Sequence, residues 1–474
     1  MANFWDCSVW GTFNLIAVLL ISLLVANSLK KTIKLLRVSL IPTSVLGGLI
    51  LLTIAGIYSA CTGKNLFDTS FFGGNGSMGL EIITYHALAL GFIATGLKMS
   101  DKKITKERSV EIFNTGVTTV STYLLQGVVG LGITLIASLI MTDLFSASGV
   151  LLPFGFGQGT GQALNYGSIY ESDYGFVGGR SFGLTVAALG FLSASFGGVI
   201  HLNILKKKGK VQINPLAEEK LNSETVEDNG EVPMNGSMDK LTIQLALIAV
   251  AYMLTYFIMW GLGILLPGMK SVIYGFNFLI GVLVSALVKV VLKWLRKVKI
   301  LKKKYVNNFL MTRVSNACFD IMVVAGIAAI RLDALKGYWL ILIILGVVGA
   351  LITYFYNYFV ANTLFKNYSE EQFLMMYGML TGTASTGVIL LRELDGDFKT
   401  PVADNLVYQN FPAIVFGFPM MLLATLAPKE PVLTLILLAV FMVVMNIILF
   451  RRQIFKRKKT AEQSTAQPIE ENKE

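Results

Sequence analysis

The sequence has few of the residues from which metal and redox sites are built. It contains only three cysteines, Cys7, Cys61 and Cys318, and two histidines, His86 and His201. They form no CxxC motif and no Cys/His cluster, so transition-metal and haem sites that use these ligands are not expected. No nucleophile-and-base set or pair of carboxylates stands within an apolar segment, as a membrane enzyme would require. We therefore expect a protein that is not an enzyme and has no cofactor.

Charge is also scarce, at 15% of 474 residues against 54% hydrophobic; a soluble domain carries about a quarter charged residues. The apolar residues form continuous blocks of about 20, the length that crosses about 30 Å of hydrocarbon as a helix. This predicts an all-α polytopic membrane protein. The N-terminus lacks a basic region, so we expect no cleavable signal peptide. The predicted spans are residues 9–29, 38–59, 81–97, 112–141, 180–204, 241–266, 271–293, 308–330, 338–364, 405–427 and 431–450.

Two further stretches, about 149–170 and about 371–391, are long enough to enter a bilayer but too rich in Gly, Thr, Ser and Gln to face lipid. Non-helical backbone survives at membrane depth only where protein or water covers it. We interpret both stretches as re-entrant hairpins, each of which returns to the side from which it came. The alternatives are glycine-rich surface loops, or glycines that let helices pack closely.

The basic residues support this span count. With the N-terminus outside and both stretches as hairpins, 33 of the 40 Lys and Arg residues fall in inside segments and six in outside segments. Such an asymmetry follows the positive-inside rule. The net charge of +11 therefore indicates membrane orientation rather than a nucleic-acid partner. We expect a multi-pass protein of the cell (inner or plasma) membrane with a cytoplasmic C-terminus.

The same count predicts two halves of opposite orientation. The N-terminal repeat is 1–205 and the C-terminal repeat is 241–430, each with five spans and a hairpin between its fourth and fifth. Five is an odd number, so the second half enters the membrane inverted, which is typical of secondary transporters. A flexible cytosolic linker (206–240), an extra span (431–450) and a disordered cytosolic tail (451–474) complete the chain, and the basic start of the tail suits membrane lipid.

The two hairpin stretches share the pattern aromatic-Gly-x-x-x-Gly-Thr, with Gly159 aligned on Gly382 and Thr160 on Thr383. Glycines allow a tight reversal, and free N–H groups at a half-helix N-terminus attract an anion such as a carboxylate. Free carbonyls at the neighbouring helix end suit Na⁺. The candidate residues for binding a small anionic substrate are Gln158, Gly159, Thr160, Gly161, Gln162, Asn165, Thr381, Gly382, Thr383, Ser385 and Thr386.

Ionisable residues inside predicted spans are costly and are often functional. Arg313, Asn316 and Asp320 share one face of the span 308–330. Arg313 is a further candidate substrate residue, although its side chain could equally extend to the inner surface. Asp320, Asn316, Thr160 and Thr383 are the candidate Na⁺ ligands. Asp320 could also carry a proton or have a structural partner.

Three segments resemble the glutamate:sodium symporter family. They are LLPFGFGQGTGQALNYGSIYESDYGF, SNACFDIMVVAGIAAIRLDALKGYW from Ser315, and YGMLTGTASTG. By position, Gly157, Gly159, Thr160 and Gly161 match the tip of the family's first hairpin, and Gly382, Thr383 and Ser385 lie where its second should be. Gln158 and Gln162 depart from the family pattern.

The resemblance implies a homodimer that takes up glutamate with Na⁺, by an elevator-like movement of a domain bearing both hairpins. Two alternatives stay open on the same fold. One is a proton-coupled carboxylate transporter with Asp320 as the carrier, and the other is a channel, which requires a continuous polar path.

Overall fold

The computed structural model describes residues 3–99, 105–209, 238–396 and 399–454. Within these ranges the structure is all-α, without a strand, and eleven helices are long and apolar enough to cross a membrane. The prediction of an all-α polytopic membrane protein is confirmed. The spanning elements are α1 (Cys7–Thr32), α3 (Thr43–Thr62), α4 (Gly76–Leu97), α5 (Lys106–Ser138), α7 (Gly179–Lys207), α8 (Lys240–Leu265), α10 (Asn277–Lys297), α11 (Asn308–Ala328), α12 (Trp339–Leu364), the successive α15 (Val402–Tyr408) and α16 (Asn410–Leu426), and α17 (Pro431–Leu449).

Shorter elements connect them, and the two predicted hairpin stretches correspond to α6 and to the pair α13 and α14. The short α-helices are α2 (Lys34–Val38), α6 (Leu151–Tyr174), α9 (Lys270–Gly275), α13 (Ser369–Thr381) and α14 (Ala384–Arg392). The 3₁₀ helices are η1 (Leu66–Asp68), η2 (Ser70–Phe72), η3 (Ser146–Val150), η4 (Pro267–Met269), η5 (Asp333–Leu335) and η6 (Lys366–Tyr368).

Each predicted span overlaps one of these helices, and the largest differences lie at the ends. The predicted span 112–141 begins earlier, at Lys106, because the Thr105 side chain accepts a hydrogen bond from the Arg108 N–H and caps a polar first turn. The resulting 33-residue helix is about 50 Å long, longer than the bilayer core is thick.

Helix ends that the predicted topology assigns to the same side of the membrane are in contact with each other in the structure. At one end, Asn308 and Met99 exchange two hydrogen bonds, and Arg108 donates to the Pro401 carbonyl. We call this the basic end, where α5, α8 and α11 begin and α4, α7, α10 and α17 end. At the opposite end Arg180 pairs with Glu81 at 3.0 Å. This pairing agrees with the predicted topology, whereas the choice of the basic end as cytoplasmic remains a prediction from charge.

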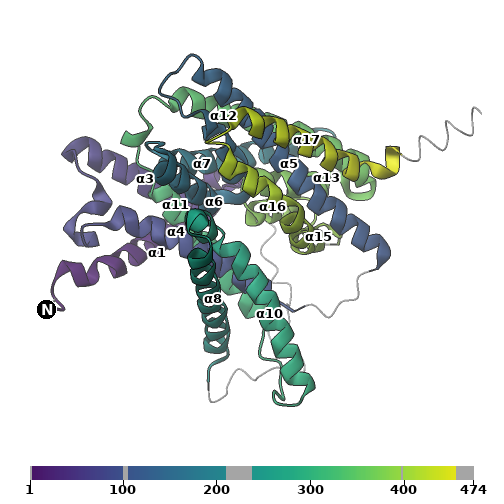
Figure 1. Cartoon of the computed structure of the whole chain (residues 1–474), viewed down its shortest axis with the longest axis horizontal. Helices are drawn as coiled ribbons and strands as arrows, with labels where there is room; N and C mark the ends of the chain where they lie inside the picture. The colour runs from purple at the N-terminus through teal and green to yellow at the C-terminus, as the bar shows by residue number, and fades with distance from the viewer. Residues whose placement is uncertain (1–2, 100–104, 210–237, 397–398, 455–474) are drawn as a thin grey trace, which may run out of the picture.

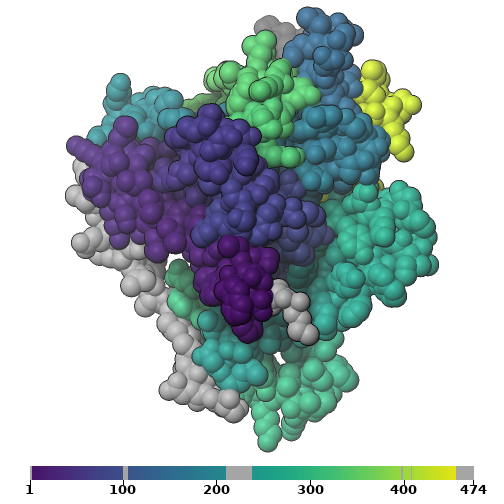
Figure 2. Space-filling view, turned by 90° about the vertical axis from the view of Figure 1, so that its left-hand side faces the viewer, coloured from purple at the N-terminus to yellow at the C-terminus, as the bar shows by residue number. Residues whose placement is uncertain are grey.

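The spans form two groups around the hairpins (Figure 1). Helix α4 packs against α11 and α10, while α5 packs against α12 and α17. The pair α8 and α10 extends from the body at the bottom of Figure 1. In the space-filling view the purple N-terminal helices cover the centre of the face turned to the viewer (Figure 2). Many large apolar side chains of α8, α10 and α12 are exposed, as lipid-facing surfaces require.

Most of the predicted linker 206–240 and of the tail 451–474 lies outside the described residues. At the edges of the linker, α7 continues to Lys207 and α8 starts at Lys240. The division into two repeats stays a prediction.

Candidate functional site

Helix α6 folds back on itself at Gly159. This residue has φ 77° and ψ −171°, an extended conformation with positive φ that is essentially restricted to glycine. The rings of Phe154 and Tyr166 stack with centroids 3.8 Å apart, although twelve residues of straight helix would separate them by about 18 Å. Residues 151–158 and 160–174 are therefore the two arms of a helical hairpin, hairpin 1.

A second hairpin is formed by α13 and α14, which we call hairpin 2. Its first arm ends at Thr381 and its second begins at Ala384, so Gly382 and Thr383 form the tip. A methyl group built on Gly378 would lie 2.8 Å from the Gly387 Cα, closer than such atoms approach. The two glycines thus let the arms touch along their backbones.

The tips of the two hairpins meet inside the molecule. A methyl group built on Gly159 would lie 3.8 Å from Thr383 Cγ2, 3.9 Å from Met322 Cε and 3.9 Å from Phe191 Cζ. A methyl group on Gly382 would lie 3.3 Å from the Phe191 ring. The two aligned Gly-Thr pairs thus occupy corresponding turns, with the buried side chain of Phe191 on α7 beside both glycines and that of Met322 on α11 beside Gly159.

Helix α5 supplies hydrogen bonds to the carbonyl groups freed by both breaks. The Tyr123 hydroxyl donates to the Gly157 carbonyl at 2.9 Å, and Gln126 Nε2 donates to the Leu380 carbonyl at 2.9 Å. A buried carbonyl without a partner is costly, so these two bonds stabilise the ends of both first arms. A carbonyl oxygen has two lone pairs, so each keeps capacity for a cation.

The second arm of hairpin 2 begins with free N–H groups. The Thr383 hydroxyl accepts from the Thr386 N–H at 3.4 Å and lies 3.3 Å from the Thr386 hydroxyl. Among the described residues, the N–H groups of Ala384 and Ser385 have no recorded hydrogen-bond acceptor. Such donors at a helix N-terminus favour an anion. Ser385 is partly exposed, and the Thr381 hydroxyl donates to the Tyr377 carbonyl at 2.7 Å.

The second arm of hairpin 1 is packed on three sides. Thr160 is fully buried, its hydroxyl donates to the Met322 carbonyl at 3.3 Å, and its side chain fills the space beside Gly326 on α11. Gly161 packs against Leu88 of α4. Further along, the Asn165 amide donates to the Gly275 carbonyl at 3.1 Å, away from the tips.

Gln162 is the polar residue of this arm whose hydrogen-bonding needs are not met. It is 1% exposed, and neither of its amide atoms has a partner within the described part of the chain. The register set by the Phe154–Tyr166 stack places Gln162 opposite Gln158, one turn from Gly159. A buried, unsatisfied amide is costly unless a ligand or water completes it.

A row of buried polar contacts runs along α5 from the basic end to the tips. Gln372 donates to Thr115 at 3.3 Å, Thr119 donates to Gln409 at 2.8 Å, and Gln126 Nε2 donates to Thr353 at 2.8 Å. We call this row, with Thr122, the polar seam. Its neutral groups offer hydrogen bonds along a line within an apolar interior.

The structure does not bring Arg313, Asn316 and Asp320 to the tips. All three side chains are exposed along one face of α11, whereas Met322, which contacts Gly159 from α11, is buried. Two residues turn a helix by about 200°, so Asp320 and Met322 point in nearly opposite directions. The Arg313 guanidinium lies over the Phe309 ring at 4.9 Å, and Asp320 is within hydrogen-bonding reach of Ser44 on α3.

Four contacts of the tips come from residues that sequence reasoning missed: Tyr123, Gln126, Phe191 and Met322. The run Thr115–Gln126 gave a usable signal, because several hydroxyl and amide side chains stand close together within one predicted span. Phe191 and Met322 look like ordinary core residues, and only the tertiary packing brings them into contact with the tips.

No group of three or more His, Cys, Asp and Glu residues suited to a metal occurs within the described ranges. No known family model matches this chain, and a comparison with curated proteins found no similar sequence. The chain is a multi-span helical membrane protein in which two hairpin tips meet.

Proposed function

We propose that the protein is a secondary active transporter that couples Na⁺ entry to uptake of glutamate or a related small carboxylate or amino acid. The observation that carries the proposal is the meeting of the two hairpin tips, with Gly159 and Thr383 in contact range. Both tips are broken helices at the centre of the bundle, which is where secondary transporters place their substrate and ion sites.

The chemistry of the tips suits an anion and a small cation together. The N-terminus of α14 presents the N–H groups of Ala384 and Ser385 to a carboxylate. The Gly157 and Leu380 carbonyls, with the Thr160 and Thr383 hydroxyls, are oxygen ligands of the kind that Na⁺ takes at half-helix ends. The unsatisfied Gln162 amide can hydrogen-bond a polar substrate between the arms.

The proposal includes an inverted repeat of two five-span halves, each with a re-entrant hairpin. It is supported by the contacts between the halves, because equivalent spans of the two halves make equivalent contacts. The second span of each half packs on the third span of the other, as α3 on α11 and α10 on α4. The two third spans pack on each other, and so do the two fourth spans. Tyr166 of hairpin 1 donates to Met421 on α16, while Tyr377 of hairpin 2 donates to Ser193 on α7, so each hairpin bonds the fifth span of the opposite half.

By the same proposal a domain that bears both hairpins moves, elevator-like, against a scaffold formed by other helices in a homodimer. The polar seam connects the tips with the basic end and is a candidate route for release on that side. The channel alternative is less well supported, because the tips contact each other and pack against the buried Phe191 and Met322, which leaves no continuous polar path there.

Proton coupling on the same fold is favoured by one observation. Asp320 is a carboxylate within a spanning helix, exposed and close to Ser44. A proton-coupled carrier should respond to the pH gradient and not to Na⁺. Uptake of labelled glutamate into proteoliposomes, with and without a Na⁺ gradient at fixed pH, separates the two mechanisms.

The same assay tests the hairpins. Thr160→Val combined with Thr383→Val keeps side-chain shape and removes both hydroxyls, so we expect saturable uptake to be lost while the protein stays folded and dimeric. Thr383→Ser retains the hydroxyl that caps α14 and is the matched control, with uptake preserved. Unchanged uptake kinetics in the double variant would remove the hairpin tips from the mechanism.

A further inference from the structure

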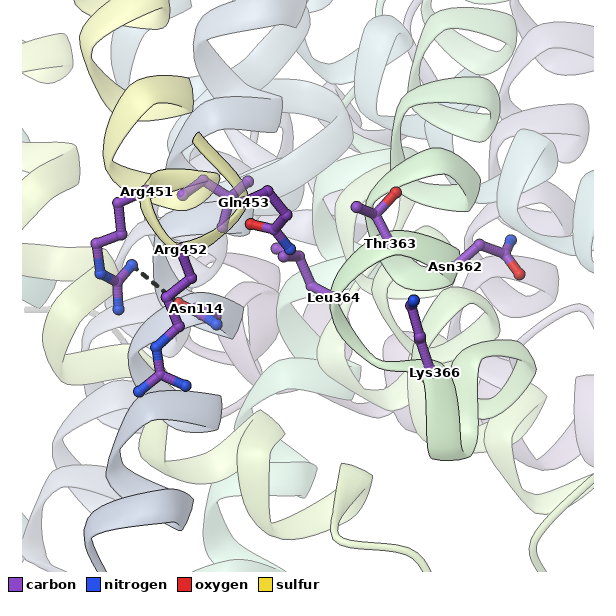
Figure 3. A pocket seen from close by; sticks show the side chains of 9 residues that line it. Asn114, Asn362, Thr363, Leu364, Lys366, Arg451, Arg452 and Gln453 are labelled. Carbon is purple, nitrogen blue, oxygen red and sulfur yellow. Dashed lines mark hydrogen bonds between the residues drawn. The ribbon is translucent and has the colours of Figure 1, made fainter. Parts of the chain in front are cut away.

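A cavity of about 550 Å³ lies at the basic end, away from the hairpin tips. It opens between the end of α12, the end of α17 and Asn114 of α5 (Figure 3). Lys366 lies on one side of it, and Arg451 and Arg452 lie on the other (Figure 3). The cavity is thus formed where the helices leave the apolar layer.

The lining of this cavity is positive. Lys366, Arg451 and Arg452 contribute three cations, and no carboxylate lines it among the described residues. Arg451 is held in place, since it donates to Asn114 Oδ1 at 3.1 Å and to the Ile448 carbonyl at 2.7 Å and lies over the Phe113 ring. Lys366 and Arg452 form no ion pair or hydrogen bond with another described residue. Within the described part of the chain, the positive charge of the cavity is therefore not neutralised by a carboxylate.

An apolar groove on the same helix extends from this region into the membrane layer. Its volume is about 390 Å³, and its walls include Met442, Val443 and Ile447 of α17 and Phe450 just after the end of that helix. Its lining residues run from Met442 on α17 to Ile454, which lies beyond the end of that helix at Leu449. Val443 and Ile447 are about half exposed, so the groove faces outward. Phe450 and Gln453, one turn apart, connect the groove to the cavity.

We propose that the cavity and the groove together bind one anionic phospholipid, with its phosphate at Lys366 and Arg452 and an acyl chain along α17. A basic pocket between spanning helices recognises an anionic headgroup by charge. An acyl chain that lies in the groove gains dispersion contacts with the side chains that line it. The buried Gln453 side-chain oxygen, which has no partner in the described part of the chain, can accept a hydrogen bond from a headgroup hydroxyl. The headgroup would fasten α17 to α12 and α5.

Native mass spectrometry of the full chain in detergent tests this, with phosphatidylglycerol, phosphatidylcholine of the same acyl chains, and inorganic phosphate as the added probes. We expect phosphatidylglycerol to bind and the other two to bind far more weakly. Lys366→Gln combined with Arg452→Gln should weaken phosphatidylglycerol binding roughly 30-fold, since each cation near an anionic headgroup contributes a factor of about five. Neither side chain has a recorded partner, so the variant should stay folded.

Two variants complete the test. Lys293→Gln combined with Arg296→Gln removes the same charge from exposed positions on α10 and should leave binding unchanged. Ile447→Trp fills the groove without altering charge and should weaken phosphatidylglycerol binding severalfold. Equal binding of phosphatidylcholine, equal binding of free phosphate, or unchanged binding by the Lys366/Arg452 variant would each overturn the proposal.

Discussion

Among single residues, Gly159 has the most constrained backbone at the candidate site. Its φ of 77° and ψ of −171° are an extended conformation with positive φ, and no atom lies close enough to exclude a methyl group by contact alone. The need for glycine is therefore conformational: this region is essentially restricted to glycine, and a residue with a Cβ is destabilised there by about 1–3 kcal/mol.

Gly159→Ala is expected to lower the free energy of unfolding by about 1–3 kcal/mol and to impair substrate binding, because alanine does not fit this backbone conformation and the tip must change shape. Thermal unfolding in detergent measures the first effect. Gly132→Ala is the control, since Gly132 lies within α5 in open space, where alanine should be neutral or slightly stabilising. Equal unfolding temperatures for both variants would show that the positive-φ conformation at Gly159 does not require glycine.

Sequence reasoning located Gly159 and Gly382 because glycines in a polar stretch between apolar blocks indicate a reversal. It could not locate the donors of Tyr123 and Gln126, since each bonds a carbonyl more than 30 residues away. Sequence reasoning also could not predict which face of α11 is turned toward the tips. The seven-residue spacing places Arg313 and Asp320 on one face, but only the packing of the helices decides whether that face contacts the tips.

At the scale of elements, hairpin 2 is held at its far end by Asp395. Its carboxylate accepts from the Lys399 N–H and the Thr400 N–H, both at 2.8 Å, and from the Thr400 hydroxyl. Burial opposes ionisation of this carboxyl, but the hydrogen bonds from Thr400 and Lys399 outweigh it and hold its pKa below the ordinary value. The charged form thus stabilises the connection from α14 to α15.

Because the pKa of Asp395 is lower in the folded than in the unfolded protein, its charged form stabilises the fold at any pH above the unfolded-state pKa of about 3.9. This stabilisation is lost as the pH falls through the lower pKa of the folded state. Asp395→Asn should therefore lower the free energy of unfolding by about 1–2 kcal/mol near neutral pH. The difference from the wild type should shrink as the pH falls below about 4. Unfolding temperatures across pH 3–7 measure this, and a difference that grows on acidification would contradict it.

The positions of the spanning helices could be predicted from the lengths of the apolar blocks, whereas the residues at which the helices begin and end depend on capping and on the residues of the first and last turns. The eleven spans could be predicted because apolar blocks must match the bilayer thickness. The start of α5 at Lys106 could not, because its first turn is polar and is stabilised by the Thr105 cap. The break between α9 and α10 lies at Phe276, which is neither glycine nor proline, so it was likewise not predicted.

At the scale of the whole molecule, the two hairpins should enter from opposite faces of the membrane. Cysteines placed at Ser146, before hairpin 1, and at Gly396, after hairpin 2, should be labelled from opposite sides by an impermeant thiol reagent. Labelling of intact cells and of inside-out vesicles measures this. If both positions react from the same side, the inverted arrangement is wrong.

The predicted topology rests on charge asymmetry, which constrains every loop at once, and it stays a prediction. Segments assigned to one side do meet in the structure, as Met99 with Asn308 and Glu81 with Arg180 show. The depth at which the tips meet depends on the packing of α5, α7 and α11 around them, which no local pattern encodes.

The central claim is that substrate and ion bind at the meeting point of the hairpin tips. The most direct measurement is ligand protection of a single cysteine at Ser385, in a background with Cys7, Cys61 and Cys318 replaced by serine. Glutamate with Na⁺ should slow thiol modification at this position severalfold, while a cysteine at the exposed Ser172, at the far end of hairpin 1, should react at an unchanged rate. An unchanged rate at Ser385 with saturating glutamate and Na⁺ would contradict the claim.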